Sequence, residues 1–240
     1  MNSGEVGPAP ARGPESRGVA VGCSVFKVGG SLLGWPPLPH RLAECLARFQ
    51  PAGGGRVVLI AGGGAACDWL RRLDQTYRLG EVMAHRLALH CLDWTAEILA
   101  ALVPGGQVAR NREGLERAWR AGSVPVLATR GFLESVDGLT CSPLPESWDL
   151  TSDSIAARIA ECLGADRLVL LKSAPLPEGA GREEAARLGL VDPLFPRLAS
   201  GLMRVEYLCL RDPEPTVREL SPAARQPPSI QGLTRPKGVS

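Results

Sequence analysis

The stretch that decides the fold is Val25-Phe26-Lys27-Val28-Gly29-Gly30-Ser31. Its β-branched and aromatic residues predict a buried strand, and the two glycines end that strand because they adopt backbone conformations that other residues avoid. A Gly-Gly-Ser turn also leaves backbone N–H groups open to an anion, and the lysine adds a positive charge beside them. The stretch therefore predicts the floor of a phosphate site. The plainer interpretation is a strand, a glycine turn and an incidental lysine.

The rarity of lysine favours the phosphate interpretation. Lysine and arginine together number 27, but the only lysines are Lys27, Lys172 and Lys237. Two of them stand at or near the ends of apolar strands, whereas Lys237 lies in a polar segment where it is expected to be solvated. An ammonium group is a compact point charge suited to a phosphate, while a guanidinium is a planar fork. We therefore interpret Lys27 and Lys172 as selected for chemistry.

A second glycine turn follows a second strand. The run from Arg56 to Ala61 is almost wholly apolar, which is typical of a parallel strand covered on both faces. Gly62, Gly63 and Gly64 follow at once, and a helix is expected from about Ala65. These glycines again expose backbone donors to a ligand, although a flexible hinge would explain them too.

A third motif, Thr151-Ser152-Asp153-Ser154, opens a helix that ends at Gly164 and precedes a strand from Arg167 to Lys172. The helix N-terminus has partial positive charge and free N–H groups, which suits phosphate, and Thr151 or Ser152 can cap it. Asp153 either stabilises the helix dipole or holds the two lysine ammonium groups around a transferring phosphoryl group. In neither case is it the chemical base.

The remaining pattern predicts an α/β fold. Helices are expected over about 39–49, 81–102, 112–121 and 183–188, strands over 124–128 and 202–210, and an irregular stretch over 129–150. Residues 1–21 are expected to be a disordered tail, 22–210 the domain, and 211–240 a polar, proline-rich tail. The long helix places His85, Arg86 and His90, each of which is either structural or a ligand group.

Composition excludes several function classes. The 240 residues are 45% hydrophobic, with a net charge of +2, a pI near 8.2 and 5% aromatic residues, so neither a nucleic-acid nor a membrane partner is implied. Seven cysteines and three histidines lack metal-ligand spacing, so no metal site is expected. The odd number of scattered cysteines indicates a reducing, cytoplasmic location. No signal peptide or membrane span is visible.

Together the three motifs resemble those of the amino acid kinase superfamily, from about Ser24 to Leu210. These enzymes are ATP-dependent phosphotransferases built as a three-layer αβα sandwich with a largely parallel central sheet. Within the superfamily, residues 83–89 and 147–156 are most similar to the aminomethylfuran phosphate kinase branch. Those enzymes make a diphosphate from (5-aminomethyl-furan-3-yl)methyl phosphate in methanofuran biosynthesis, and relatives occur with tetrahydromethanopterin-linked one-carbon metabolism.

The resemblance implies a role for each residue of the site. Lys27, Asp153 and Lys172 would be catalytic, with Asp153 orienting the two lysines. ATP with Mg²⁺ would be the phosphate donor, and its phosphates would meet Lys27, Gly29, Gly30, Ser31, Ser152, Lys172 and Ser173. A small-molecule acceptor would meet Gly62, Gly63, Gly64, His85, Asp149 and Thr151, and the protein would be a homo-oligomer. One departure is that residues 173–177, Ser-Ala-Pro-Leu-Pro, lack the Asp-Gly-Val-type turn that many relatives carry around the nucleotide.

Two other functions stay open at this point. One is a related kinase that acts on a carboxylate or a nucleoside monophosphate. The other is a nucleotide-binding sensor or storage protein without turnover. A dinucleotide-binding oxidoreductase is poorly supported, because no Gly-x-Gly-x-x-Gly opens a helix after the first strand. We further predict that Asp149 pairs with a cationic amine of the acceptor, since it lies just before the proposed phosphate helix.

Overall fold

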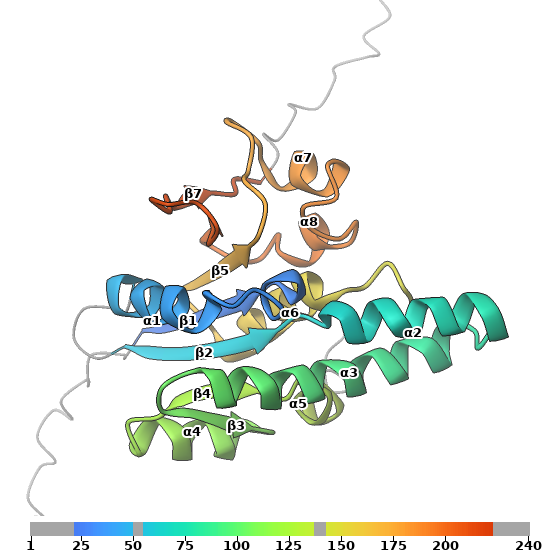
Figure 1. Cartoon of the computed structure of the whole chain (residues 1–240), viewed down its shortest axis with the longest axis horizontal. Coiled ribbons are helices and arrows are strands. Elements are labelled where there is room, and N and C mark those ends of the chain that lie inside the picture. Colours follow the sequence, from blue (N-terminus) through green and yellow to red (C-terminus); the bar gives the residue numbers. More distant parts are fainter. Residues whose placement is uncertain (1–21, 50–54, 137–142, 223–240) are drawn as a thin grey trace, which may run out of the picture.

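A computed structural model describes residues 22–49, 55–136 and 143–222 of the chain (Figure 1). A seven-stranded sheet in the order β3-β4-β2-β1-β5-β6-β7 forms its centre. All neighbouring strands are parallel except β7, which is antiparallel to β6. The strands are β1 Cys23–Val28, β2 Arg56–Ala61, β3 Gly106–Ala109, β4 Val124–Leu127, β5 Arg167–Lys172, β6 Val205–Cys209 and β7 Arg218–Glu219.

Helices cover both faces of the sheet (Figure 1). They are η1 Gly30–Leu32 (a single 3₁₀ turn), α1 Leu38–Phe49, α2 Gly64–Tyr77, α3 Glu81–Leu102, α4 Arg112–Arg120, α5 Thr129–Val136, α6 Ser152–Leu163, α7 Arg182–Arg187 and α8 Phe195–Leu198. Buried residues of α1 and of the C-terminal half of α3 pack on one face. Those of α4, α5, α6, α7 and α8 pack on the other. The predicted three-layer αβα sandwich is confirmed.

Alternation along β1 separates the two hydrophobic cores. Val25 packs in the core beneath α6, whereas Phe26 and Val28 pack in the core beneath α1 and α3. Successive side chains of a strand point to opposite faces, so Lys27 shares the face of Val25 and extends toward α6. In the parallel register Lys27 is paired with Leu170 of β5. Lys172, two residues beyond Leu170, therefore lies on this same face.

The strand order places a topological switch point between β1 and β5. From β1 the chain proceeds to β2 on one side, and from β5 it proceeds to β6 on the other. In open parallel sheets, connections that leave in opposite directions open a crevice at the carboxyl ends of the two strands, and ligands bind there. In this chain those ends carry Gly29, Gly30, Lys172 and Ser173, which are among the residues the sequence singled out.

The structure differs from the sequence expectation in two places before the last strand. The strand β3 was not expected, because its four residues, Gly-Gln-Val-Ala, show no clear apolar alternation. The stretch 129–150 is not irregular throughout, since its first residues form α5. That helix buries Phe132 and Leu133 against the core, and this burial outweighs the cost of Gly131 within it.

The expected tail from residue 211 is wrong for the part that is described. Residues 218 and 219 form β7, Leu220 is fully buried, and its backbone N–H donates to the carbonyl oxygen of Val205 at 2.8 Å. The buried guanidinium of Arg182 donates from Nε to the carbonyl oxygen of Leu220 at 2.9 Å. Residues 1–21 and 223–240, expected to be tails, lie outside the described residues. Within the described ranges, no helix is long and apolar enough to cross a membrane.

Candidate active site

Two lysines and one aspartate form a buried charge cluster at the carboxyl ends of β1 and β5. The Nζ atom of Lys27 lies 2.7 Å from Oδ1 of Asp153, and Nζ of Lys172 lies 2.7 Å from Oδ2 of the same carboxylate. Lys27 is 3% exposed and Asp153 is 4% exposed. The strand register puts both lysines on one face, and the first turn of α6 crosses that face. The three residues that the sequence grouped are therefore brought together.

The cluster holds its groups in defined charge states. Burial alone would raise the pKa of the Asp153 carboxyl, but Lys172 and Lys27 outweigh burial and lower this pKa to about 2. Burial lowers the pKa of the Lys172 ammonium to about 8, against the opposing attraction of Asp153. Asp153 is therefore a carboxylate at neutral pH and a poor proton acceptor. The cluster carries two cations for one anion, and an incoming phosphate would balance the excess positive charge.

The two glycine turns pack directly against each other. A Cβ atom on Gly30 would lie 2.2 Å from the backbone nitrogen of Gly64, and one on Gly62 would lie 2.5 Å from the nitrogen of Gly30. Gly64 also has a φ of +52°, which disfavours any other residue. Only glycine allows the backbones to approach so closely. The turns thus form one block at the end of β1 and β2.

Not every amide of these turns is open, which corrects the sequence interpretation. The N–H of Gly29 donates to the carbonyl oxygen of Leu171, and that of Gly62 donates to Val28, both at 2.8 Å. These two bonds extend the sheet by one residue. Beyond them, α2 begins at Gly64. Its N-cap residue is Gly63, which has no side chain that could accept from the first N–H groups of the helix. The first amides of α2 are therefore available to an anion.

Two serines predicted to meet ATP phosphates lie side by side. The hydroxyl oxygens of Ser31, after β1, and Ser173, after β5, are 2.8 Å apart. Arg211 donates from Nη2 to the carbonyl oxygen of Ser31 at 3.4 Å. Because the two serines follow the ends of β1 and β5, this pair of hydroxyls lies at the switch point.

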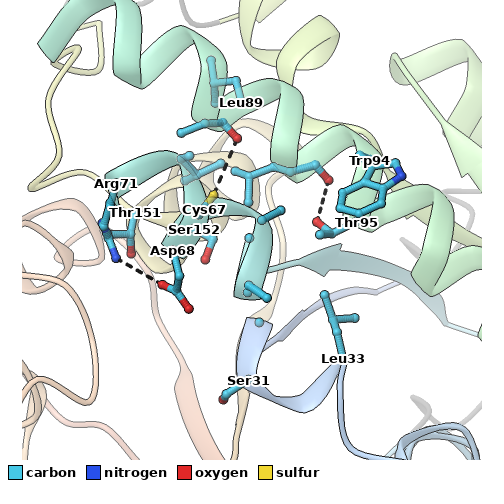
Figure 2. Close-up of a pocket in the computed structure, with 18 of the residues that line it drawn as sticks. Ser31, Leu33, Cys67, Asp68, Arg71, Leu89, Trp94, Thr95, Thr151 and Ser152 are labelled. Atoms are coloured by element: carbon cyan, nitrogen blue, oxygen red, sulfur yellow. Dashed lines mark hydrogen bonds and ion pairs between the residues drawn. The ribbon is translucent and has the colours of Figure 1, made fainter. Parts of the chain in front are cut away.

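A cavity of about 830 Å³ opens beside the cluster, between α2, α3 and the segment that leads into α6. Figure 2 shows Asp68 and Arg71 near Thr151 and Ser152, with Leu33, Trp94 and Thr95 farther along its wall. Gly30 and Ser152 line it as well, so it begins next to Lys27 and Asp153. Its lining is mainly small and apolar, with Cys67, Asp68, Arg71 and His85 as titratable groups.

The N-terminus of α6 is partly occupied by a carboxylate of the chain itself, which narrows a second expectation. Thr151 is the N-cap by position but makes no side-chain cap bond. Instead the carboxylate of Asp192 accepts from the backbone N–H groups of Thr151 and Ser154 at 3.2 and 3.0 Å. A carboxylate from another part of the chain therefore holds these two amides, and they are not free for phosphate.

The residues predicted for the acceptor divide into two groups. Gly63, Gly64, His85 and Thr151 line the cavity. Burial lowers the pKa of His85, so this imidazole is neutral at physiological pH. Asp149 is exposed and is absent from the described lining, although its neighbours Trp148 and Leu150 belong to it. Gly62 is buried behind the turn, and His90 is exposed on α3.

Part of the cavity wall depends on side-chain contacts that the sequence did not indicate. Trp148 donates from Nε1 to Oδ2 of Asp74 at 2.8 Å, and the guanidinium of Arg71 stacks 5.0 Å from its ring centre. Arg86 approaches Glu146 at 3.5 Å. These contacts fasten residues 146–148 to α2 and α3. Arg71 and Asp74 recur at helical spacing from Cys67, a signal visible in the sequence only once the glycine turn is taken as the start of a binding helix.

A family model described as the amino acid kinase family matches residues 22–175. The [5-(aminomethyl)furan-3-yl]methyl phosphate kinase of Methanocaldococcus jannaschii is 25% identical over 148 residues, which are 61% of this chain and 63% of that protein. The chain thus matches less than two thirds of that relative's length.

Two solved structures have a similar fold. The uridylate kinase of Archaeoglobus fulgidus superposes with a TM-score of 0.53 at 14% identity, over 77% of this chain and 89% of that one. The UMP kinase of Bacillus anthracis gives 0.53 at 11% identity, over 80% and 88% of the two chains. Similarity at these identities shows a shared fold.

Proposed function

The chain belongs to the amino acid kinase family, and from this premise we propose that it is an ATP-dependent phosphotransferase with a small, phosphate-bearing acceptor. The proposed acceptor is (5-aminomethyl-furan-3-yl)methyl phosphate or a close analogue, in the formation of a methanofuran-type one-carbon cofactor. The observation that carries the proposal is the Lys27–Asp153–Lys172 cluster, with both ammonium groups 2.7 Å from one carboxylate at the switch point.

The cluster suits phosphoryl transfer because that reaction depends on placement and charge stabilisation. An oxygen of the acceptor phosphate attacks the γ-phosphorus of ATP. The bond to the bridging oxygen breaks, ADP leaves, and a diphosphate forms. Lys27 would contact the transferring group, Lys172 would neutralise charge on the ATP side, and Asp153 would hold both ammonium groups in place. Ser31 and Ser173 would donate hydrogen bonds from their hydroxyls to the ATP phosphates. The N–H of Gly29 is already bonded to Leu171, so Gly29 and Gly30 would contribute a close approach of the backbone to those phosphates.

Mg²⁺ would arrive with ATP, whose phosphates bind it. Among residues 22–49, 55–136 and 143–222 there is no group of three or more His, Cys, Asp and Glu that could hold a metal ion. The carboxylate of the charge cluster, Asp153, is already paired with two lysines. The chain's own groups therefore fit the charge of the phosphates better than they fit the metal, and the metal would supply further charge neutralisation.

The acceptor would occupy the cavity with its phosphate toward α2. The first amides of α2, at Gly64 and Ala65, line the cavity and carry the positive end of the helix dipole. The opposite end of an aminomethylfuran is a cationic amine. We propose Asp149 as its partner, and the lining makes Asp68 the rival candidate.

Two matched variants separate these candidates. If Asp149 binds the amine, Asp149→Asn raises KM for the amine acceptor about tenfold with little change in kcat, while Asp68→Asn leaves KM unchanged. Such a split is the signature of lost substrate binding. The reverse result assigns the amine to Asp68, and an unchanged KM in both variants contradicts an amine-bearing acceptor.

A nucleoside monophosphate is the second candidate acceptor. The cavity of about 830 Å³ is large for a furan, and the exposed aromatic ring of Trp94 lies in its wall. Pockets for drug-sized ligands span roughly 300–1,000 Å³, so the volume suits a nucleotide as well.

Release of ADP from ATP and Mg²⁺ is the deciding measurement. The wild-type protein is screened with the aminomethylfuran phosphate, with nucleoside monophosphates and with small carboxylates, and Lys27→Ala serves as the inactive control. Turnover with the furan phosphate supports the proposal, and turnover only with another acceptor reassigns the substrate. ATP binding without ADP formation for any acceptor overturns the kinase and leaves a sensor or storage role.

We also propose a cytoplasmic homo-oligomer. Cys23, Cys45, Cys67, Cys91 and Cys209 are free thiols, which is compatible with a reducing compartment. Large apolar side chains are exposed on α2 and α3, namely Trp69, Tyr77, Val82, Met83, Leu87 and Trp94. Burial of this face against a second copy would remove apolar surface from water. Light scattering on the purified protein measures the mass and tests the proposal.

A further inference from the structure

A short segment between α7 and α8 holds two parts of the charge cluster at once. The carbonyl oxygen of Leu190 accepts from Nζ of Lys172 at 2.7 Å. Two residues later the carboxylate of Asp192, which is 6% exposed, contacts the start of α6. This segment lies beyond residue 175, where the match to the family model ends. Neither the sequence motifs nor the proposed mechanism uses it.

Asp192 clamps the turn that carries Asp153. Its Oδ2 atom accepts from the hydroxyl of Thr151 at 2.8 Å and from the backbone N–H groups of Thr151 and Ser154. Its Oδ1 atom accepts from the hydroxyl of Ser154 and from the N–H of Leu194. Asp153 stands between the two residues that are held. A shift of this turn would therefore move the carboxylate that both lysines share.

Asp192 also acts on Lys172 through its charge. The groups that face the Lys172 ammonium are Asp153 from α6, Lys27 from β1 and Asp192 itself. On β6, burial raises the pKa of both Tyr207 and Cys209, so these side chains remain neutral. Asp192 thus raises the pKa of Lys172, in opposition to the dominant effect of burial.

We propose that Asp192 is a positioning residue, which fixes the first turn of α6 so that Asp153 orients Lys27 and Lys172, and which adds a negative charge to the surroundings of Lys172. The proposal rests on the proposed phosphotransferase function for its kinetic part. Its electrostatic part concerns the free protein and does not depend on turnover.

The kinetic test compares Asp192→Asn with Ser154→Ala in the full chain. Asp192→Asn removes the charge and weakens the clamp, so kcat should fall about 10- to 100-fold while KM for ATP changes less than threefold. The alkaline limb of kcat/KM, which reports the free enzyme, should move to lower pH. Ser154→Ala removes one bond to the carboxylate and keeps its charge, so kcat should fall a few-fold and the limb should stay in place.

A second readout uses the scarcity of lysine. With only Lys27, Lys172 and Lys237 in the chain, ¹³C-labelled lysine gives three ε-methylene NMR signals, and Lys172→Arg assigns the relevant one. In the protein without ligands, the titration midpoint of Lys172 should be lower in Asp192→Asn than in wild type. It should be unchanged in Asp192→Glu, which restores the charge. If Asp192→Asn does not fold, the few-fold fall in kcat expected of Ser154→Ala tests the clamp instead, and an unchanged kcat in that variant contradicts it.

The outcomes separate three cases. A lower midpoint together with a lower kcat supports the proposal. If Asp192→Asn lowers only the urea midpoint of unfolding and leaves kcat and the Lys172 titration unchanged, Asp192 is a helix cap alone and the proposal is wrong. If the wild-type protein forms no ADP with any acceptor, the proposed function fails, and the Lys172 titration still decides the electrostatic part by itself.

Discussion

The charge cluster at β1 and β5 and the cavity between α2 and α3 are neighbours built on different principles. The cluster is buried, ionic and held by sheet register, so each group has one arrangement. The cavity is largely apolar and is walled partly by residues 146–148, which side-chain contacts fasten to the helices. The difference teaches that the sheet places the two lysines of the cluster, while the cavity wall depends on side-chain contacts between residues 146–148 and the helices.

The largest effect should come from Asp153→Asn. Removing the carboxylate leaves two buried ammonium groups uncompensated, which should cost about 4 kcal/mol in unfolding free energy and lower kcat at least 100-fold. Urea denaturation and ADP release measure the two effects. Asp149→Asn, at an exposed position, is the stability control. It should change the free energy of unfolding by less than about 0.5 kcal/mol. A kcat within threefold of wild type would contradict the role of the cluster.

The contact between the glycine turns should be nearly as sensitive. Gly30→Ala places a methyl group 2.2 Å from the nitrogen of Gly64, so the turns must separate. We expect a loss of about 3 kcal/mol in unfolding free energy, at the upper end of the usual cost of overpacking. Gly34→Ala is the matched control, because a Cβ atom there meets nothing within 4 Å. Equal stability of the two variants would show that the turns are not packed as described.

The cluster also predicts a pH dependence of stability with a definite sign. The pKa of Asp153 is lowered from 3.8 to about 2 in the folded protein, so its stabilisation is complete above pH 5 and disappears as the pH falls toward 2. The contribution is about 2 kcal/mol. The pKa of Lys172 is lowered from 10.5 to about 8, so this group destabilises the fold below pH 8, and the penalty disappears as the pH rises toward 10.5.

Urea unfolding at a series of pH values measures both contributions. The loss of stability between pH 5 and pH 2 should be absent in Asp153→Asn. The gain of stability between pH 8 and pH 10.5 should be absent in Lys172→Met. A wild-type curve that is flat between pH 5 and pH 2 would contradict the ion pairs of Asp153.

The smallest effect should come from the cavity wall. Trp148→Phe keeps an aromatic ring beside Arg71 but removes the hydrogen bond from Nε1 to Asp74. Loss of about 1 kcal/mol of acceptor binding free energy should raise KM for the acceptor about fivefold and leave kcat unchanged. Trp69→Phe, at a side chain that is 59% exposed on α2, should change neither constant. A lower kcat in Trp148→Phe would mean that the wall and the cluster are coupled.

Local chemistry in the sequence predicted the cluster well. Apolar runs ending in Lys27 and Lys172, and a helix that begins at Ser152, are patterns within a few residues, and the structure joins them through the sheet. The clamp by Asp192 could not be predicted in this way, because it depends on a contact between positions 38 residues apart. The same holds for β7, whose two residues have no strand pattern and gain their place from β6.

The glycine turns were predicted only in part. The sequence indicated exposed amides, but it could not show that Gly29 and Gly62 use theirs within the sheet. Nor could it show that the glycines serve first to let two backbones touch. That role depends on the lateral order of β1 and β2, which becomes known only with the structure.

The alternation along β1 sets a limit on how this chain can change in evolution. Lys27 reaches Asp153 because it lies two positions after Val25, which packs beneath α6, so both side chains point to the same face of the sheet. A deletion or insertion of a single residue between them would turn the ammonium group toward the opposite layer, among Phe26 and the side chains of α1. Among relatives of this chain, insertions and deletions should therefore occur in the loops between helices and strands. They should be absent between residues 25 and 27.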